Sequence, residues 1–121
     1  MDWTSLTSLD QIQGIDRLPS NKIALIFKHS TSCSISHIAR KRLLIFSEKE
    51  DLNQVGLEIY YLDLLAHRNI SNYIAHHYSV HHESPQVLLI RNGECFYDSS
   101  HLDITSEELS EQIFSVAPAS I

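Results

Sequence analysis

Five consecutive apolar residues, Ile23 to Phe27, stand between Lys22 and Lys28, and this run limits the possible folds most strongly. A strand with one face in water alternates apolar and polar residues. An uninterrupted apolar strand is typical of a sheet that is covered on both faces. We therefore expect residues 22–28 to form an inner strand with helices packed above and below it.

The segments around this strand alternate between helix and strand patterns. Residues 6–18 carry apolar side chains at intervals of three, which predicts an amphipathic helix that Pro19 ends. Residues 57–64 are rich in β-forming side chains and predict a second strand, and a shorter helix is expected over residues 70–78. Between the strand over residues 22–28 and the strand over residues 57–64 lies another predicted helix. Its buried stripe is expected to be Ile35, Ile38, Ala39, Leu43 and Phe46.

The last third of the chain predicts a hairpin and a final helix. Strands over residues 86–91 and 94–98 flank Asn92-Gly93, a pair that favours a tight turn because both residues accept positive φ. Thr105 and Glu108 have the spacing of a capping box, in which each side chain satisfies a free backbone amide of the helix start. The inner face of the helix that follows is expected to be Leu109, Ile113 and Val116.

Alternating strands and helices predict an α/β fold with right-handed crossovers. A parallel pair of strands extended by an antiparallel hairpin forms a mixed four-stranded sheet with helices on both faces. This is a thioredoxin-like arrangement. A chain of 121 residues is most simply one such domain, spanning residues 1–121.

Charge and hydropathy exclude several classes of partner. The formal net charge of -6 disfavours nucleic acid, which is bound by basic surfaces, and Arg40-Lys41-Arg42 is interpreted as a solvated helix face. The apolar runs are far shorter than the roughly 20 residues of a membrane-spanning helix. The first residues lack the apolar core of a signal peptide. We therefore expect a cytoplasmic protein with no membrane association.

Cys33 lies in the stretch HSTSCSIS, where the inner strand should give way to a helix. Unpaired amides at a helix start carry partial positive charge and stabilise a thiolate relative to the thiol. Lys28 and His29 would add positive potential if they faced the sulfur. The surrounding hydroxyl groups also suit a reactive cysteine better than a buried one; they belong to Ser30, Thr31, Ser32, Ser34 and Ser36.

Ser36 occupies the position where a second cysteine would complete a C-x-x-C pair. Such a pair resolves a mixed disulfide internally, because the second thiol attacks the first. Serine can donate a hydrogen bond to the thiolate but cannot form a disulfide. Cys33 is therefore expected to accept an adduct that an outside thiol removes. Cys95 is interpreted as a packing residue of the returning strand, with a resolving role left open.

Two further features have alternative interpretations. Ser84-Pro85 stands just before a buried strand, where a cis bond would aim the backbone of Ser84 at an extended substrate; an ordinary trans proline at a strand start is the alternative. Among the eight histidines, His77 and His81 would share a helix face as metal ligands if the helix continued unbroken. An exposed histidine surface without metal is the favoured interpretation.

The segments 27–36 and 82–86, with the hairpin at 91–93 and Ser100-His101 beyond it, resemble the YtxJ-type monothiol bacilliredoxin family over residues 4–116. These proteins are thioredoxin-like members of the bacillithiol redox system. The family's usual loop is T-C-P-I-S, so that Ser32 replaces threonine and Ser34 replaces proline. Without that proline, the amide of residue 34 is free to donate toward the sulfur, which affects the rigidity and thiol specificity of the loop.

The resemblance implies a thiol-disulfide oxidoreductase that removes bacillithiol from mixed disulfides on cytosolic proteins. Cys33 would be the attacking thiolate, and free bacillithiol, a co-substrate and not a bound cofactor, would regenerate it. The substrate-binding residues would be Ser32, Ser34, Ser36, Ser84 and Pro85. Two alternatives remain open: a redox-sensing or binding module whose cysteine is capped once, and an iron-sulfur carrier like the monothiol glutaredoxins.

Overall fold

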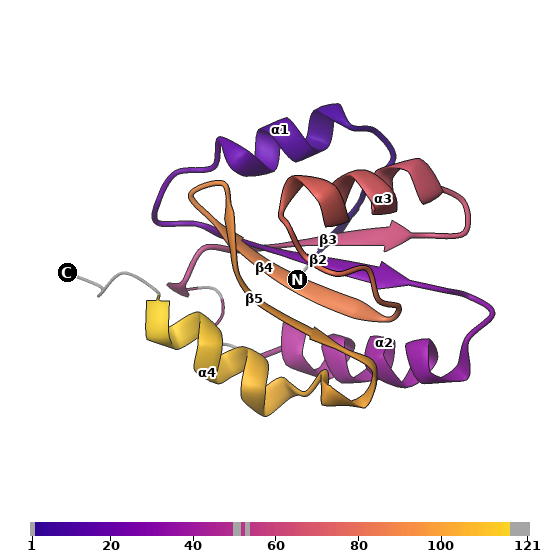
Figure 1. The fold of residues 1–121 in the computed structure, drawn as a ribbon. Coiled ribbons are helices and arrows are strands. Elements are labelled where there is room, and N and C mark those ends of the chain that lie inside the picture. Colours follow the sequence, from indigo (N-terminus) through magenta and orange to yellow (C-terminus); the bar gives the residue numbers. More distant parts are fainter. Residues whose placement is uncertain (1, 50–51, 53, 117–121) are drawn as a thin grey trace.

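A computed structural model describes residues 2–49, 52 and 54–116 and shows a five-stranded mixed sheet between two pairs of helices. Figure 1 shows α1 and α3 on one face and α2 and α4 on the other. The predicted single domain over residues 1–121 thus includes positions outside the described residues. The elements are β1 (Trp3–Ser5), α1 (Asp10–Asp16), β2 (Ile23–His29), α2 (Ser34–Ser47), β3 (Leu57–Asp63), α3 (Arg68–His77), β4 (Gln86–Arg91), β5 (Glu94–Ser100), the 3-10 turn η2 (His101–Asp103) and α4 (Ser106–Val116).

The strand β2 lies at the centre of the sheet, as its apolar run predicted. The strand order is β1-β3-β2-β4-β5, with β2 parallel to β3 and antiparallel to β4. All seven of its residues are buried. Ile23, Leu25 and Phe27 belong to the core beneath α2 and α4, whereas Ala24 and Ile26 belong to the core beneath α1 and α3. Alternate side chains of one strand therefore hold both layers of helices.

The amino-terminal segment differs from the predicted helix over residues 6–18. Trp3–Ser5 form the edge strand β1, parallel to β3, and the helix begins only at Asp10. Trp3 explains this pairing, because its ring stacks on Tyr61 and meets the Phe27 ring edge-on, both at centroid distances of 6.2 Å. The sheet consequently has five strands and not four, although the thioredoxin-like class is confirmed.

The buried face of α2 is rotated relative to the predicted stripe. Ala39, Leu43 and Phe46 are buried as expected, but Ile35 and Ile38 are 37% and 43% exposed. Ser36 takes the inner position of the first turn and is fully buried. Positions 36, 39 and 43 lie at the spacing of one helix face, so the two isoleucines fall on the neighbouring, open face.

The predicted hairpin and helix cap are present. Asn92 and Gly93 have φ values of 53° and 74°, and β5 continues beyond the expected residue 98 to Ser100. The amide of Glu108 donates to Thr105 Oγ1 at 3.2 Å, which is one half of the capping box. Along α4, Leu109 and Ile113 are buried and Val116 is partly buried. Among the described residues, no helix is long and apolar enough to cross a membrane.

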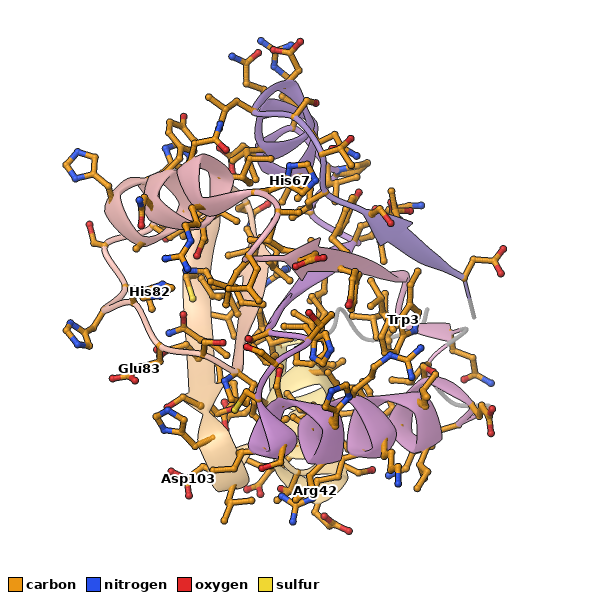
Figure 2. All side chains as sticks on the ribbon, turned by 90° about the vertical axis from the view of Figure 1, so that its right-hand side faces the viewer. Trp3, Arg42, His67, His82, Glu83 and Asp103 are labelled. Atoms are coloured by element: carbon orange, nitrogen blue, oxygen red, sulfur yellow. The ribbon has the colours of Figure 1, made fainter. Side chains whose placement is uncertain are left out.

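Four segments meet at one edge of the sheet. His29 pairs with Asp63 across β2 and β3, and Gln86 pairs with both Lys28 and Ser100. The carboxyl ends of β2, β3 and β5 and the amino end of β4 are therefore neighbours. We call the segments 29–33, 63–67, 81–85 and 100–103 the site edge; Figure 2 views the molecule from this end.

Candidate active site

Cys33 is the N-cap residue of α2, at the site edge. Its backbone is extended, with φ of -112° and ψ of 123°, and its carbonyl accepts the hydrogen bond of His37 N at 3.3 Å. The side chain is half-buried and makes no capping hydrogen bond. The sulfur therefore stands at the positive end of a helix of 14 residues and is not engaged as a cap.

Ser36 holds the loop in front of Cys33. Its hydroxyl oxygen accepts a hydrogen bond from Ser30 N at 3.0 Å, and the hydroxyl is hydrogen-bonded to His29 Nδ1 at 2.7 Å. The side chain has no exposed surface. The resemblance implied a substrate-binding role for Ser36, and its hydroxyl was considered as a possible donor to the thiolate. The structure instead commits its hydroxyl to the loop backbone and to His29, beneath the surface that a substrate would contact.

Ser32 and Ser34 flank the sulfur on the exposed side of the loop. Ser32 Oγ lies 3.1 Å from Ser30 Oγ, and the neighbouring carbonyl of Thr31 accepts a hydrogen bond from His37 Nε2 at 3.0 Å. The loop is thus held from its inner side and from the second turn of α2. Both serines remain accessible to a molecule that approaches Cys33.

His29 is buried and does not add positive charge to the site. Burial lowers the pKa of its imidazole, and the neighbouring His37 and Arg40 act in the same direction. Its ring lies against those of His37 and Tyr61, at centroid distances of 5.1 and 5.5 Å. A neutral imidazole hydrogen-bonded to Ser36 through Nδ1 fits these surroundings. Lys28 faces the other layer of the sheet, where its amine donates to the Ser71 carbonyl of α3.

The Ser84-Pro85 bond is cis, which confirms the predicted backbone of this turn. Pro85 is buried, and its carbonyl accepts a hydrogen bond from His101 N at 3.0 Å. The fully buried side chain of Gln86 donates from Nε2 to His81 O at 2.9 Å and accepts from Glu83 N at 3.4 Å. Sequence analysis had given Gln86 no role. The segment before β4 is therefore fastened on both sides of the proline.

The histidines do not assemble a metal site in the described part of the chain, where no group of three or more His, Cys, Asp or Glu side chains is arranged around a common point. α3 ends at His77, whose Nε2 lies 2.6 Å from Asp16 of α1. His81 and His101 lie 3.6 and 3.4 Å from the two carboxylate oxygens of Glu83. The helix therefore does not continue to His81, and the alternative of a shared His77 and His81 face does not arise.

Cys95 lies on the opposite side of the sheet from α2. Its side chain packs against the core beneath α1 and α3, and its thiol donates to Tyr97 O at 3.3 Å. Burial raises the pKa of this thiol to about 11. These surroundings agree with the packing role and give Cys95 no access to Cys33 across the sheet.

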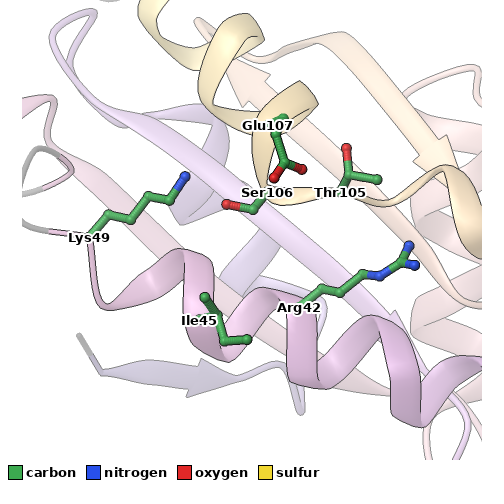
Figure 3. A pocket seen from close by; sticks show the side chains of 6 residues that line it. All are labelled: Arg42, Ile45, Lys49, Thr105, Ser106 and Glu107. Carbon is green, nitrogen blue, oxygen red and sulfur yellow. The ribbon is translucent and has the colours of Figure 1, made fainter.

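A cavity of about 400 Å³ lies between α2 and the start of α4, where Figure 3 shows Arg42, Ile45 and Lys49 facing residues 105–107. Arg42 Nη1 donates to the carbonyls of Leu102 and Ile104, at 2.9 Å each. Arg42 follows Cys33 by roughly 13 Å along the helix axis at 1.5 Å per residue. This cavity is therefore separate from the cysteine, and Arg42 fastens α2 to η2.

Comparisons with known proteins agree with this geometry. Residues 4–109 match the family described as monothiol bacilliredoxin BrxC. A solved structure described as a putative oxidoreductase with a thioredoxin fold is 31% identical, with a TM-score of 0.78 over 90% of this chain and 91% of that chain.

Thioredoxins share the fold at lower identity. The Malassezia sympodialis thioredoxin is 14% identical with a TM-score of 0.72, over 97% of this chain and 92% of its own. A thioredoxin mutant from Halobacterium salinarum is also 14% identical, with a TM-score of 0.70 over 99% and 95%. The family match covers most of the chain and includes Cys33 and Ser84-Pro85, so the protein belongs to the monothiol bacilliredoxin family, whose thioredoxin-like fold serves thiol redox chemistry.

Proposed function

We propose that the protein removes a small thiol, bacillithiol in the first instance, from mixed disulfides on other proteins, with Cys33 as the nucleophile. The observation that carries this proposal is the arrangement of its three key side chains. Cys33 is accessible at the start of α2, a buried serine stands at position 36, and Cys95 packs on the other side of the sheet. The chain has only these two cysteines, so the adduct needs an outside thiol.

The reaction consists of two thiol-disulfide exchanges. The Cys33 thiolate attacks the sulfur of the small thiol in the mixed disulfide. The disulfide of the target breaks, and the target cysteine leaves as a thiolate that takes a proton from water. A second small thiol, as its thiolate, then attacks the adduct and forms a symmetric small-thiol disulfide. Cys33 is released as a thiolate, and the small thiols supply the two electrons that reduce the target.

The surface around Cys33 supports the proposed substrate contacts. Ser32 and Ser34 are exposed beside the sulfur, and the backbone of Ser84 precedes the buried Pro85 at the same edge of the sheet. There an extended segment of the target protein can pair with the backbone of Ser84 through main-chain hydrogen bonds, as an added strand would. Ser36 acts on this surface from beneath by holding the loop.

Intact-mass spectrometry tests the proposal directly. The full-length protein is incubated with a bacillithiolated test protein and, separately, with a glutathionylated one. We expect one small-thiol adduct on Cys33 and none in Cys33→Ser, while Cys95→Ser reacts as the unchanged protein does. Added free thiol should restore Cys33 over many cycles. An internal disulfide between Cys33 and Cys95, seen as the loss of two hydrogens, would contradict the monothiol route; an adduct that no thiol releases would indicate a sensor.

A further inference from the structure

Lys28 is a fully buried lysine without a carboxylate partner in the described part of the chain. Its side chain has no exposed surface, and no described carboxylate oxygen lies within 4.0 Å of Nζ. Nζ donates to Ser71 O at 3.1 Å and to His82 Nδ1 at 3.3 Å, which uses two of its three protons. These bonds satisfy the amine as a donor, but neither partner neutralises its charge.

A buried ammonium group without an opposite charge is costly, because burial removes it from water. Burial lowers the pKa of Lys28 to about 8, so the amine still carries its proton at neutral pH. The same electrostatic surroundings affect His82. Burial lowers the pKa of its imidazole, and the charges of Lys28 and Arg68 lower it further. Among the described groups that shift the pKa of His82, Glu83 is the only negatively charged one, so the surroundings of His82 remain electropositive.

A small cavity lies next to this electropositive group. It has a volume of about 50 Å³ and is lined by Leu64, Arg68, Ser71, Asn72 and His82. Two of these residues, Ser71 and His82, are the partners of the Lys28 amine. The lining contains guanidinium, hydroxyl, amide and imidazole groups but no carboxylate. Its volume exceeds the roughly 30 Å³ share of one water molecule, which is enough for a group the size of a carboxylate.

We propose that this cavity binds one carboxylate or a similar small oxyanion, held by Arg68, Ser71 and His82 with the Lys28 amine behind them. The cavity lies on the α3 face of the sheet, whereas Cys33 starts α2 on the other face; the two are linked by Lys28, five residues before Cys33 on β2, and by His82, in the segment that ends at Ser84-Pro85 (Figure 2). The anion is either free in solution or part of the small thiol. The second source rests on the proposed function.

The binding test uses the full-length protein and two defined probes, sodium phosphate and sodium acetate, at constant ionic strength. Ring and guanidinium resonances of His82 and Arg68 are followed by NMR. We expect saturable shifts, with affinity reduced about tenfold or more in Arg68→Gln, since a hydrogen bond to a charged group contributes about that factor. Arg17→Gln is the matched control, because Arg17 is exposed and follows α1, which contacts the far end of α3.

Shifts that rise linearly with both probes, or saturate equally in Arg68→Gln, would overturn the inference. Because Arg68 is exposed, its substitution carries little risk of unfolding. Absence of binding alongside normal adduct formation at Cys33 would refute the anion site and leave the proposed function standing.

A second experiment identifies the source of the anion. Test proteins carrying glutathione or glutathione dimethyl ester are compared as substrates, because the ester has no free carboxylate. If the cavity holds the thiol's carboxylate, Arg68→Gln slows reaction of the acid about tenfold and leaves the ester unchanged. If the glutathione and dimethyl ester substrates react at equal rates, both with the unchanged protein and with Arg68→Gln, and phosphate binding is saturable, the anion is a free one. Loss of adduct formation in unchanged protein would instead contradict the proposed function.

Discussion

Ser36 Oγ and His29 Nδ1 lie 2.7 Å apart and join the first turn of α2 to the end of β2. The same hydroxyl oxygen accepts a hydrogen bond from Ser30 N. One buried side chain of α2 therefore holds the start of the loop that leads to Cys33. In a dithiol protein this position would hold the resolving cysteine. Here it stabilises the conformation in which Cys33 caps the helix, which links the absence of a second thiol to the shape of the nucleophile loop.

Ser36→Ala should destabilise the folded protein by about 1–3 kcal/mol. The substitution leaves the buried amide of Ser30 without an acceptor and His29 Nδ1 without its hydrogen-bond partner, and unpaired buried groups cost about this much. Urea unfolding measures the change in free energy. Ser34→Ala is the control, because Ser34 lies two residues away in the same turn but is exposed, and should change stability by less than about 0.5 kcal/mol. Equal effects of the two substitutions would refute the holding role of Ser36.

Ser36→Cys should convert the protein to a dithiol route. The new thiol would stand in the first turn of the helix that Cys33 caps, where it can attack an adduct on Cys33. We expect adducts to be short-lived and an internal disulfide to accumulate, measured by intact mass after thiol trapping. Cys33→Ser combined with Ser36→Cys should form no such disulfide. Persistent adducts in the single variant would show that the loop holds position 36 away from the sulfur.

The two cysteines should differ strongly in reactivity toward iodoacetamide at pH 8. With its pKa raised to about 11, Cys95 is thiolate in only about one molecule in a thousand, and the thiolate is the reactive form. Peptide mapping of the folded protein should show labelling of Cys33 well before Cys95. Labelling in denaturant provides the control, since both cysteines should then react. Comparable rates in the folded protein would contradict the buried environment of Cys95.

Stability should fall as the pH drops below about 6.5. The folded-state pKa of His29 lies below the ordinary value of 6.5, so the unfolded chain binds more protons in the window beneath that value. Protonation therefore favours unfolding there, and stability rises again with pH up to about 6.5. Urea midpoints between about pH 5 and 7.5 measure this slope. His29→Asn should reduce this slope and leave the part that His82 contributes, because burial lowers the pKa of the His82 imidazole as well. An unchanged slope in His29→Asn would refute the assignment.

Local sequence patterns predicted those parts of the structure that depend on near neighbours. The apolar run of β2 indicated a doubly covered strand, and Asn92-Gly93 indicated a turn with two positive φ values. The position of Cys33 at a helix start followed from the same change of pattern. Such features are determined by backbone preferences and by the period of apolar residues, both of which can be read within a few positions.

Other features depend on residues that are distant in sequence. β1 forms because Trp3 meets rings of β2 and β3, and a three-residue strand has too few positions to show a period. The inner position of Ser36 on α2 likewise follows from His29 and the Ser30 amide, which offer it hydrogen bonds that Ile35 could not make. In each case tertiary contacts outweighed the local apolar pattern.

The sequence by itself determined the fold class, the position of Cys33 at a helix start and the absence of a C-x-x-C pair. Only the tertiary structure decided where the polar side chains of the site point. Sequence reasoning left open whether Ser36 and Lys28 act on the sulfur, and each is fully buried and bonded elsewhere. The physical reason is that a buried polar group must find its partner, and those partners come from segments that only the folded sheet brings together.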